Sequence, residues 1–202
     1  MHPANKLFWS NCKVRYPRYF EENNRVLEFG SYDINGSIRP LFQSRDYVGI
    51  DWRPGPNVDH VSLAHNVRLS DADVVVSASM LEHDPYWAMS LETMVLHLRT
   101  EGLMILSWGA ARNREHCLAE APDGLFHALP AGRVLRQLQK LGMVVHEFWY
   151  ESSLATMGFA RNSDGTGEVG LVAFVQCSQA NTMHPFRHFD ALLPEDAVPG
   201  NP

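Results

Sequence analysis

Residues 25–51 constrain the fold of this chain more than any other stretch. Residues 26–29 read Val-Leu-Glu-Phe and predict a short buried strand, which ends where Gly30 lets the backbone turn. A polar turn follows, and Gly36 is predicted to open a helix that tolerates Pro40 in its first turn. A second β-rich run, residues 47–50, ends on Asp51. The predicted order is therefore strand, glycine turn, helix, strand, acid.

Such a unit presents a helix N-terminus and a glycine turn to one end of a ligand, and a carboxylate to its ribose hydroxyls. A turn that binds a dinucleotide has the spacing G-x-G-x-x-G. Here Gly30 and Gly36 are separated by residues with side chains, Asp33 among them. An anionic turn suits an ammonium or a sulfonium better than a phosphate. The sequence thus predicts S-adenosylmethionine as the cofactor, with S-adenosylhomocysteine as its product, and not NAD.

Three runs of sequence carry a resemblance to a known family. They read Val-Leu-Glu-Phe-Gly-Ser-Tyr-Asp-Ile-Asn-Gly-Ser, Tyr-Val-Gly-Ile-Asp-Trp-Arg-Pro-Gly-Pro-Asn-Val-Asp and Met-Leu-Glu-His-Asp-Pro-Tyr-Trp. Together they resemble the class I S-adenosylmethionine-dependent methyltransferases, and more narrowly the small bacterial and phage members with a Gly-Ser-x-Asp-x-Asn-Gly-Ser cofactor loop. The likeness is strong over residues 25–107 and weak beyond them.

The resemblance implies an α/β fold of three layers, Rossmann-like, around a mostly parallel seven-stranded sheet whose last strand is antiparallel. We expect one domain over residues 1–180, with residues 1–24 as an N-terminal helical cap and residues 181–202 as a loosely packed tail. The cap is rich in aromatic residues. It is predicted either to cross the mouth of the cofactor site or only to cover one edge of the sheet.

The resemblance also implies which residues bind the cofactor. The glycine turn lines the methionine half, Asp51 accepts from the ribose hydroxyls, and Trp52 stacks on adenine. Asn66 stands where relatives usually carry an acid, and an amide oxygen accepts a hydrogen bond equally well. The predicted cofactor-binding residues are Glu28, Gly30, Ser31, Tyr32, Asp33, Asn35, Gly36, Asp51, Trp52, Asn66, Val67 and Ser77.

Glu82, His83 and Asp84 form the densest polar cluster of the chain, directly after the strand predicted at residues 72–77. Ligands bind at the carboxyl ends of such strands. The cluster is open to three interpretations, namely a general base, metal ligands, or a capped helix start with incidental acids. We name His83 as the catalytic candidate and assign no metal site.

The remaining pattern completes the alternation of strands and helices. A helix is predicted from Pro85 to a stop at residues 100–102, followed by a strand at residues 103–108. Residues 110–129 read as a substrate-side insertion, in which Arg112 and Arg114 clamp an anionic group, or as a solvated surface loop. A helix from Pro130 ends at Gly142, and residues 143–150 and 168–177 are predicted to form a terminal hairpin.

Composition excludes several functions. The net charge of −6 argues against bulk electrostatic binding of nucleic acid. The three cysteines are scattered and odd in number, so they indicate neither a disulfide framework nor a zinc cluster. A signal segment and an 18-residue apolar run are both missing, and we expect a cytoplasmic protein with no membrane partner. The oligomeric state is open.

These features predict a methyltransferase that acts on a small-molecule, glycan-like or peptide acceptor. The main alternative is a non-catalytic S-adenosylmethionine-binding or scaffolding protein of the same fold. A nucleotide-binding oxidoreductase is disfavoured by the glycine spacing. A nucleic-acid methyltransferase is disfavoured because the chain carries neither an Asn/Asp-Pro-Pro-Tyr motif nor a paired catalytic cysteine motif.

Overall fold

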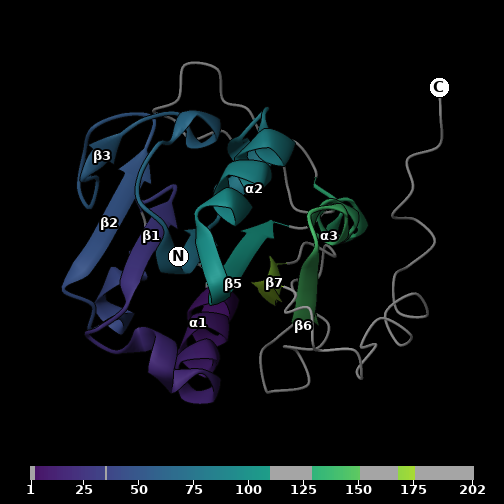
Figure 1. The fold of residues 1–202 in the computed structure, drawn as a ribbon, viewed down its shortest axis with the longest axis horizontal. Helices are drawn as coiled ribbons and strands as arrows, with labels where there is room; N and C mark the ends of the chain where they lie inside the picture. Colours follow the sequence, from purple (N-terminus) through teal and green to yellow (C-terminus); the bar gives the residue numbers. More distant parts are fainter. Residues whose placement is uncertain (1–2, 35, 110–128, 151–167, 176–202) are drawn as a thin grey trace.

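A computed structural model describes residues 3–34, 36–109, 129–150 and 168–175, and its seven strands form one sheet (Figure 1). The strand order is β3-β2-β1-β4-β5-β7-β6. Strands β1 to β5 pair in parallel, and β7 runs antiparallel to both of its neighbours. The strands are β1 (Arg25–Phe29), β2 (Asp46–Asp51), β3 (His60–Val61), β4 (Ala72–Ala78), β5 (Leu98–Gly109), β6 (Met143–Tyr150) and β7 (Glu168–Val175). The predicted mostly parallel α/β fold is confirmed.

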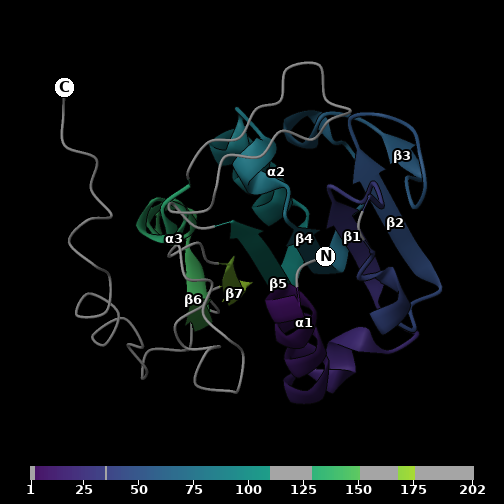
Figure 2. The same cartoon turned by 180° about the vertical axis from the view of Figure 1, so that it is seen from behind.

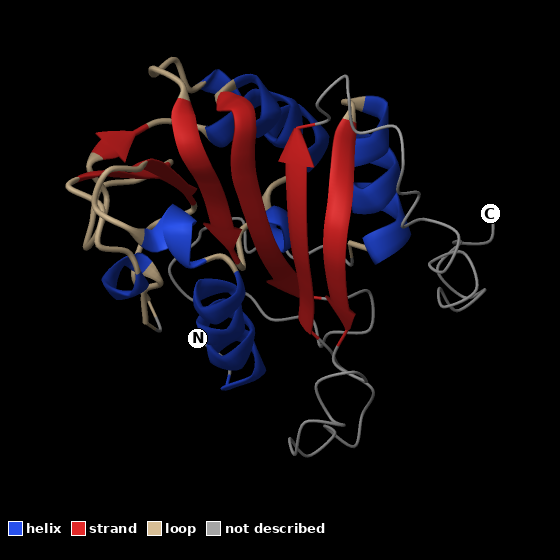
Figure 3. Cartoon of the chain, turned by 60° about the horizontal axis from the view of Figure 1, so that its bottom comes forward, coloured by secondary structure: helices blue, strands red, loops and turns tan. Residues whose placement is uncertain are grey.

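Helices cover both faces of this sheet, which gives three layers (Figure 3). On one face α2 (Trp87–Leu96) and α3 (Ala131–Lys140) pack on inward-facing residues of β1, β4 and β5 such as Phe29, Val75 and Leu106. On the other face α1 (Pro3–Arg15) and the 3₁₀ turn η1 (Pro17–Phe20) pack on the alternate residues of the same strands. Strands buried on both faces are expected to be continuously apolar, as the run Val74, Val75 and Val76 of β4 is.

The predicted helix after Gly36 is wrong. In the described residues between β1 and β2, which leave out Asn35, the one helical segment is the 3₁₀ turn η2 (Arg39–Leu41), and the backbone is extended again at Phe42. The Ser37 hydroxyl accepts from the Arg39 amide at 3.0 Å and holds this turn. The segment is short and rich in glycine, serine and proline, so it offers too few propagating residues to offset the cost of helix nucleation.

Helix α1 covers the face that this short connection leaves open (Figure 2). Phe8 and Trp9 are fully buried against Val74, Val76 and Ile105 of β4 and β5. The first turn of α1 also reaches the carboxyl ends of the strands, because Asn5 contacts Ser79 just after β4. Helix α1 thus covers a face of the sheet, and it begins at the edge where a ligand is expected.

The boundary between α2 and β5 differs from the prediction. Helix α2 ends at Leu96, and β5 already begins at Leu98, which pairs with Ala72 of β4. A register shift follows in the pairing between β4 and β5, and Glu101 takes a left-handed φ of 63° within β5. The sequence around Gly102 was interpreted as a helix stop, whereas it marks an irregular strand. The later helix α3 ends as predicted, with Gly142 at φ +76°.

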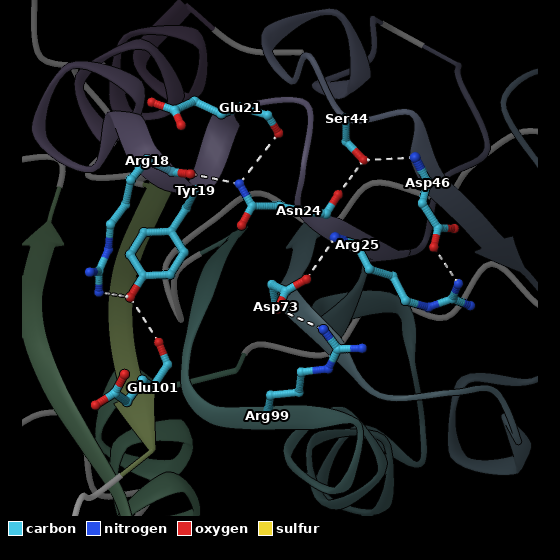
Figure 4. A network of polar contacts seen from close by, with 10 residues as sticks. All are labelled: Arg18, Tyr19, Glu21, Asn24, Arg25, Ser44, Asp46, Asp73, Arg99 and Glu101. Carbon is cyan, nitrogen blue, oxygen red and sulfur yellow. Dashed lines mark hydrogen bonds and ion pairs between the residues drawn. The ribbon is translucent and has the colours of Figure 1, made fainter.

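A polar network ties the amino ends of the strands together (Figure 4). Asp73 at the start of β4 accepts from the Arg25 amide of β1 and from the Arg99 guanidinium of β5, both at 2.8 Å. Arg25 also pairs with Asp46 at the start of β2 at 2.6 Å. This edge is therefore held by charge pairs and is opposite to the edge where the predicted site residues lie.

Three predictions fall on residues outside the described part of the chain. They concern Asn35 of the cofactor loop, the arginine clamp at Arg112 and Arg114, and the tail at residues 181–202. Among the helices that the structure describes, none combines the length and the apolar character needed to cross a bilayer.

Candidate functional site

The turn after β1 is the centre of the candidate site. The amides of Gly30 and Ser31 both donate to the Ile50 carbonyl of β2, at 2.8 and 3.0 Å, so β1 and β2 end together. Gly30 has a φ of +80°, and a Cβ on it would lie 2.4 Å from the Cβ of Met80, which follows β4. A glycine is required here by both the backbone conformation and the close approach of β4.

Asp51 ends β2 beside this turn, and its side chain is only 9% exposed. One carboxylate oxygen accepts from the Tyr32 amide at 3.2 Å, and the other accepts from the Arg53 amide at 3.4 Å. Burial raises the pKa of Asp51, and these backbone donors oppose the rise. Each oxygen retains lone pairs that can accept from further donors, such as ribose hydroxyls. The structure thus places the predicted ribose acid next to the glycine turn.

The loop that starts at Ser31 is fastened to the loop after β2. Asp33 accepts from the Gly36 amide at 2.7 Å and from the Asn57 side chain at 3.3 Å, while its own amide donates to the Pro56 carbonyl. Asp33 was predicted to line the methionine half of the cofactor, and this role stays a prediction. Its two oxygens each accept one hydrogen bond that shapes this loop, and each retains a lone pair for a further donor.

Tyr32 packs over the same loop through its ring. The Arg53 guanidinium lies 4.2 Å from the centre of the Tyr32 ring, and a Cβ on Gly55 would collide with that ring at 1.8 Å. The arginine also lies 5.4 Å from the ring of Trp52, which is 52% exposed. Trp52 thus presents an open aromatic face next to Asp51, where adenine stacking was predicted.

Glu28 lies one position before the end of β1 and is buried behind the turn. The Tyr47 hydroxyl donates to its carboxylate at 2.9 Å. Burial is the main cause that raises the pKa of Glu28, from 4.5 to about 7, and the charges of Asp33 and Asp51 raise it further. The Tyr47 hydrogen bond and Arg39 act in the opposite direction. Three carboxyl groups therefore gather around this turn. Asp33 and Asp51 supply the negative charge that favours a cationic ligand, whereas the buried Glu28 holds its proton up to about pH 7.

The other predicted cofactor residues lie around this centre at different depths. Ser77 of β4 is in register with Phe29 of β1, and its hydroxyl is buried with no hydrogen-bond partner among the described residues. The Ser31 hydroxyl is buried in the same unpaired state and packs against Gly49 of β2. Asn66 is exposed at the end of η3 (Ala64–Asn66), whereas Val67 is fully buried in the core.

The polar cluster after β4 separates into three roles. Asp84 accepts from the Tyr86 amide at 2.8 Å and from the Ser90 hydroxyl, so it closes the turn that begins α2. Glu82 is buried and accepts from the Gly109 amide of β5 at 2.9 Å. His83 is half-buried in η4 (Leu81–His83), and its catalytic role stays a prediction. In the described part of the chain, no group of three or more His, Cys, Asp or Glu side chains is placed to hold a metal ion.

Sequence reasoning missed four residues that lie at the site or support it from behind. Tyr47 and Arg53 were not singled out, although one binds Glu28 and the other covers Tyr32. Asn5 and Ser79 were also missed, and they contact each other across 74 positions of sequence. No local pattern signals such pairs, because both partners come from different elements and meet only when the sheet forms.

Solved structures share this architecture. The chain has a TM-score of 0.63 to 1,6-didemethyltoxoflavin-N1-methyltransferase of Burkholderia thailandensis, crystallised with 1,6-didemethyltoxoflavin and S-adenosylhomocysteine, at 13% identity over 87% of this chain and 79% of that one. The TM-score to an S-adenosylmethionine-dependent methyltransferase of Clostridium acetobutylicum ATCC 824 is 0.61, at 8% identity over 88% of this chain and 93% of that one. The chain has the Rossmann-like fold of class I S-adenosylmethionine-dependent methyltransferases.

The same fold also occurs in an enzyme named for another reaction. The [4+2]-cyclase SpnF matches with a TM-score of 0.56 at 13% identity, over 84% of this chain and 80% of that one. Neither a family model nor a curated protein matches the sequence. At these identities the likeness shows the class I methyltransferase fold and leaves the reaction to be argued from the site.

Proposed function

We propose that this chain is an S-adenosylmethionine-dependent methyltransferase that methylates a small-molecule, glycan-like or peptide acceptor. The observation that carries the proposal is the buried Asp51 carboxylate at the end of β2, held by the Tyr32 amide of the glycine turn. An acid in this place is suited to the ribose hydroxyls of a nucleoside cofactor. The neighbours in structure that are named methyltransferases support the same reaction class.

The residues around Asp51 fit a polar cofactor with a cationic centre. Gly30 leaves room for close approach to the backbone. The hydroxyls of Ser31 and Ser77, which have no hydrogen-bond partner in the described part of the chain, are polar groups that a ligand can satisfy. The Asp33 carboxylate adds negative charge beside them, and Glu28 adds to it only where the pH exceeds its raised pKa. This environment is suited to a sulfonium and an ammonium and is unfavourable for a diphosphate.

When bound, S-adenosylmethionine supplies an activated methyl group on a sulfonium. The residues of this chain then align the donor and keep water away from it, and an oxygen or nitrogen acceptor must also lose a proton. We assign that proton to His83, which is half-buried directly after β4. Trp52 and Asn66 are assigned to adenine, one through its exposed ring and the other through its amide.

Calorimetry with S-adenosylmethionine, S-adenosylhomocysteine and NAD tests the cofactor. We expect the first two to bind, and we expect Asp51→Ala to weaken their binding by about tenfold or more, as the loss of a charged hydrogen bond predicts. Asp46→Ala is the matched control, because Asp46 begins the strand that Asp51 ends and pairs with Arg25 at the opposite edge. Binding of NAD alone, or equal affinities for both variants, would end this assignment.

A non-catalytic protein that binds S-adenosylmethionine is the second candidate. SpnF shares the fold and is named a cyclase, so a class I fold is compatible with other roles. Transfer of a labelled methyl group from S-adenosylmethionine into a cell extract distinguishes the two candidates. Label that appears with the unaltered protein and is lost with Asp51→Ala supports the methyltransferase, whereas donor binding without transfer supports the second candidate.

A further inference from the structure

The first two turns of α1 make two matching contacts with the ends of neighbouring strands. The Asn5 side-chain amide donates to the Ser79 hydroxyl at 3.1 Å, and the Trp9 indole donates to the Ser107 hydroxyl at 3.1 Å. Residues four apart lie on one face of a helix, so α1 holds both hydroxyls with the same face. The two serines differ in exposure, because Ser107 is 2% exposed whereas Ser79 lies at the surface.

Ser79 stands next to the glycine turn. It follows β4 with a left-handed φ of 56°, and its amide donates to the Ser107 carbonyl at 2.8 Å. The next residue, Met80, is the one that approaches Gly30 most closely. A non-glycine residue in this conformation carries strain, which is often found where a side chain must be aimed at a ligand.

Asn5 determines where the Ser79 hydroxyl hydrogen points. Asn5 is 2% exposed and donates to the Ser79 oxygen through its side-chain amide, while its own amide oxygen is buried with no partner among the described residues. Because that contact fills a lone pair of the Ser79 oxygen, the hydroxyl hydrogen is directed away from Asn5. The result is an oriented O–H donor at the surface of the site.

An O–H donor at this position can offset the repulsion between the acidic residues of the site and an anionic group of the ligand. The carboxylates of Asp33 and Asp51 favour the cationic groups of a methyl donor but repel the carboxylate of its amino-acid half. We propose that the Ser79 hydroxyl, oriented by Asn5, donates to that carboxylate. The inference rests on the proposed function, and within it Ser79 contacts the ligand while Asn5 is a positioning residue.

Two compounds that differ only in the amino-acid half test the proposal by calorimetry. S-adenosylhomocysteine carries the carboxylate, and 5′-methylthioadenosine lacks the whole amino-acid half. We expect Ser79→Ala to weaken binding of the first by about five- to tenfold and to leave the second unchanged. Asn5→Asp keeps the size of the side chain but removes its donor and turns the Ser79 hydrogen toward position 5, so the same selective loss is expected.

Ser107→Ala is the matched control, since its hydroxyl is held by α1 in the same way but is buried. Ser107→Ala should change neither the affinity for S-adenosylhomocysteine nor that for 5′-methylthioadenosine. Equal affinity of Ser79→Ala and the unaltered protein for S-adenosylhomocysteine would overturn the inference, as would an equal loss for both compounds. If the unaltered protein binds neither compound, the proposed function itself fails and the inference fails with it.

Discussion

Glu28→Gln should change how the stability of this protein depends on pH. The Glu28 carboxyl is 3% exposed, and burial raises its pKa from 4.5 to about 7. Each pKa unit corresponds to about 1.4 kcal/mol, so the difference corresponds to about 3 kcal/mol of unfolding free energy. The side chain keeps its proton in the folded state over a pH range in which the unfolded chain has already lost it.

The sign of the effect follows from this proton. Between pH 4.5 and 7 the folded state binds more protons than the unfolded state, so the Glu28 contribution to stability falls as the pH rises through this window and is constant above it. Glutamine cannot ionise, and its amide oxygen still accepts from the Tyr47 hydroxyl. The unfolding free energy of the unaltered protein should therefore decline relative to that of Glu28→Gln by about 3 kcal/mol from pH 4.5 to 8.

Urea unfolding followed by tryptophan fluorescence at a series of pH values measures this difference. All other titrating groups are common to both proteins, so the difference curve isolates Glu28. Tyr47→Phe is a useful companion, because the Tyr47 hydrogen bond lowers the pKa of Glu28 and its removal should move the decline to higher pH. Parallel curves for the unaltered protein and Glu28→Gln over the whole window would refute the argument.

Two further predictions concern stability at the two ends of the strands. Gly30→Ala should lower the unfolding free energy, measured by urea titration, by about 2 kcal/mol or more, and by more than Gly142→Ala does. Both glycines have a left-handed φ, but only a Cβ at Gly30 meets a neighbour. Equal losses for the two variants would show that Met80 moves aside freely. Asp73→Ala should lower the unfolding free energy by about 1 to 2 kcal/mol and leave the affinity for S-adenosylhomocysteine unchanged, because the contacts of Asp73 lie at the amino ends of the strands. A weaker affinity for S-adenosylhomocysteine would contradict the separation of the two edges of the sheet.

The sequence predicted those parts of the fold that depend on local pattern. The continuous apolar run of β4 and the glycine at the end of α3 each follow from a few neighbouring residues. The turn at Gly30 and the acid at the end of β2 were found for the same reason. Local pattern did not predict that β5 already starts at Leu98, because that boundary depends on the pairing of Leu98 with β4.

The site residues were predictable only where one continuous stretch of sequence supplies them. Asp51 and the glycine turn belong to one unit of sequence, whereas the Tyr47 contact with Glu28 depends on how β1 and β2 pair. The contact between Asn5 and Ser79 depends on the packing of α1 across the sheet. Residues of this second kind carry no signal in a single sequence, since their chemistry is defined by a partner far away in the chain.

The missing helix after β1 bears on the choice of cofactor. A dinucleotide fold binds its diphosphate with the N-terminus of that helix, where unpaired amides and the helix dipole favour an anion. Here the connection holds only the 3₁₀ turn η2, and the Gly36 amide donates to the Asp33 carboxylate within the loop. The Gly36 amide is therefore used within the loop, and the described part of the turn carries the negative charge of Asp33. The described residues of this connection therefore offer no helix N-terminus of the kind that holds a diphosphate, which agrees with the inference drawn from the glycine spacing.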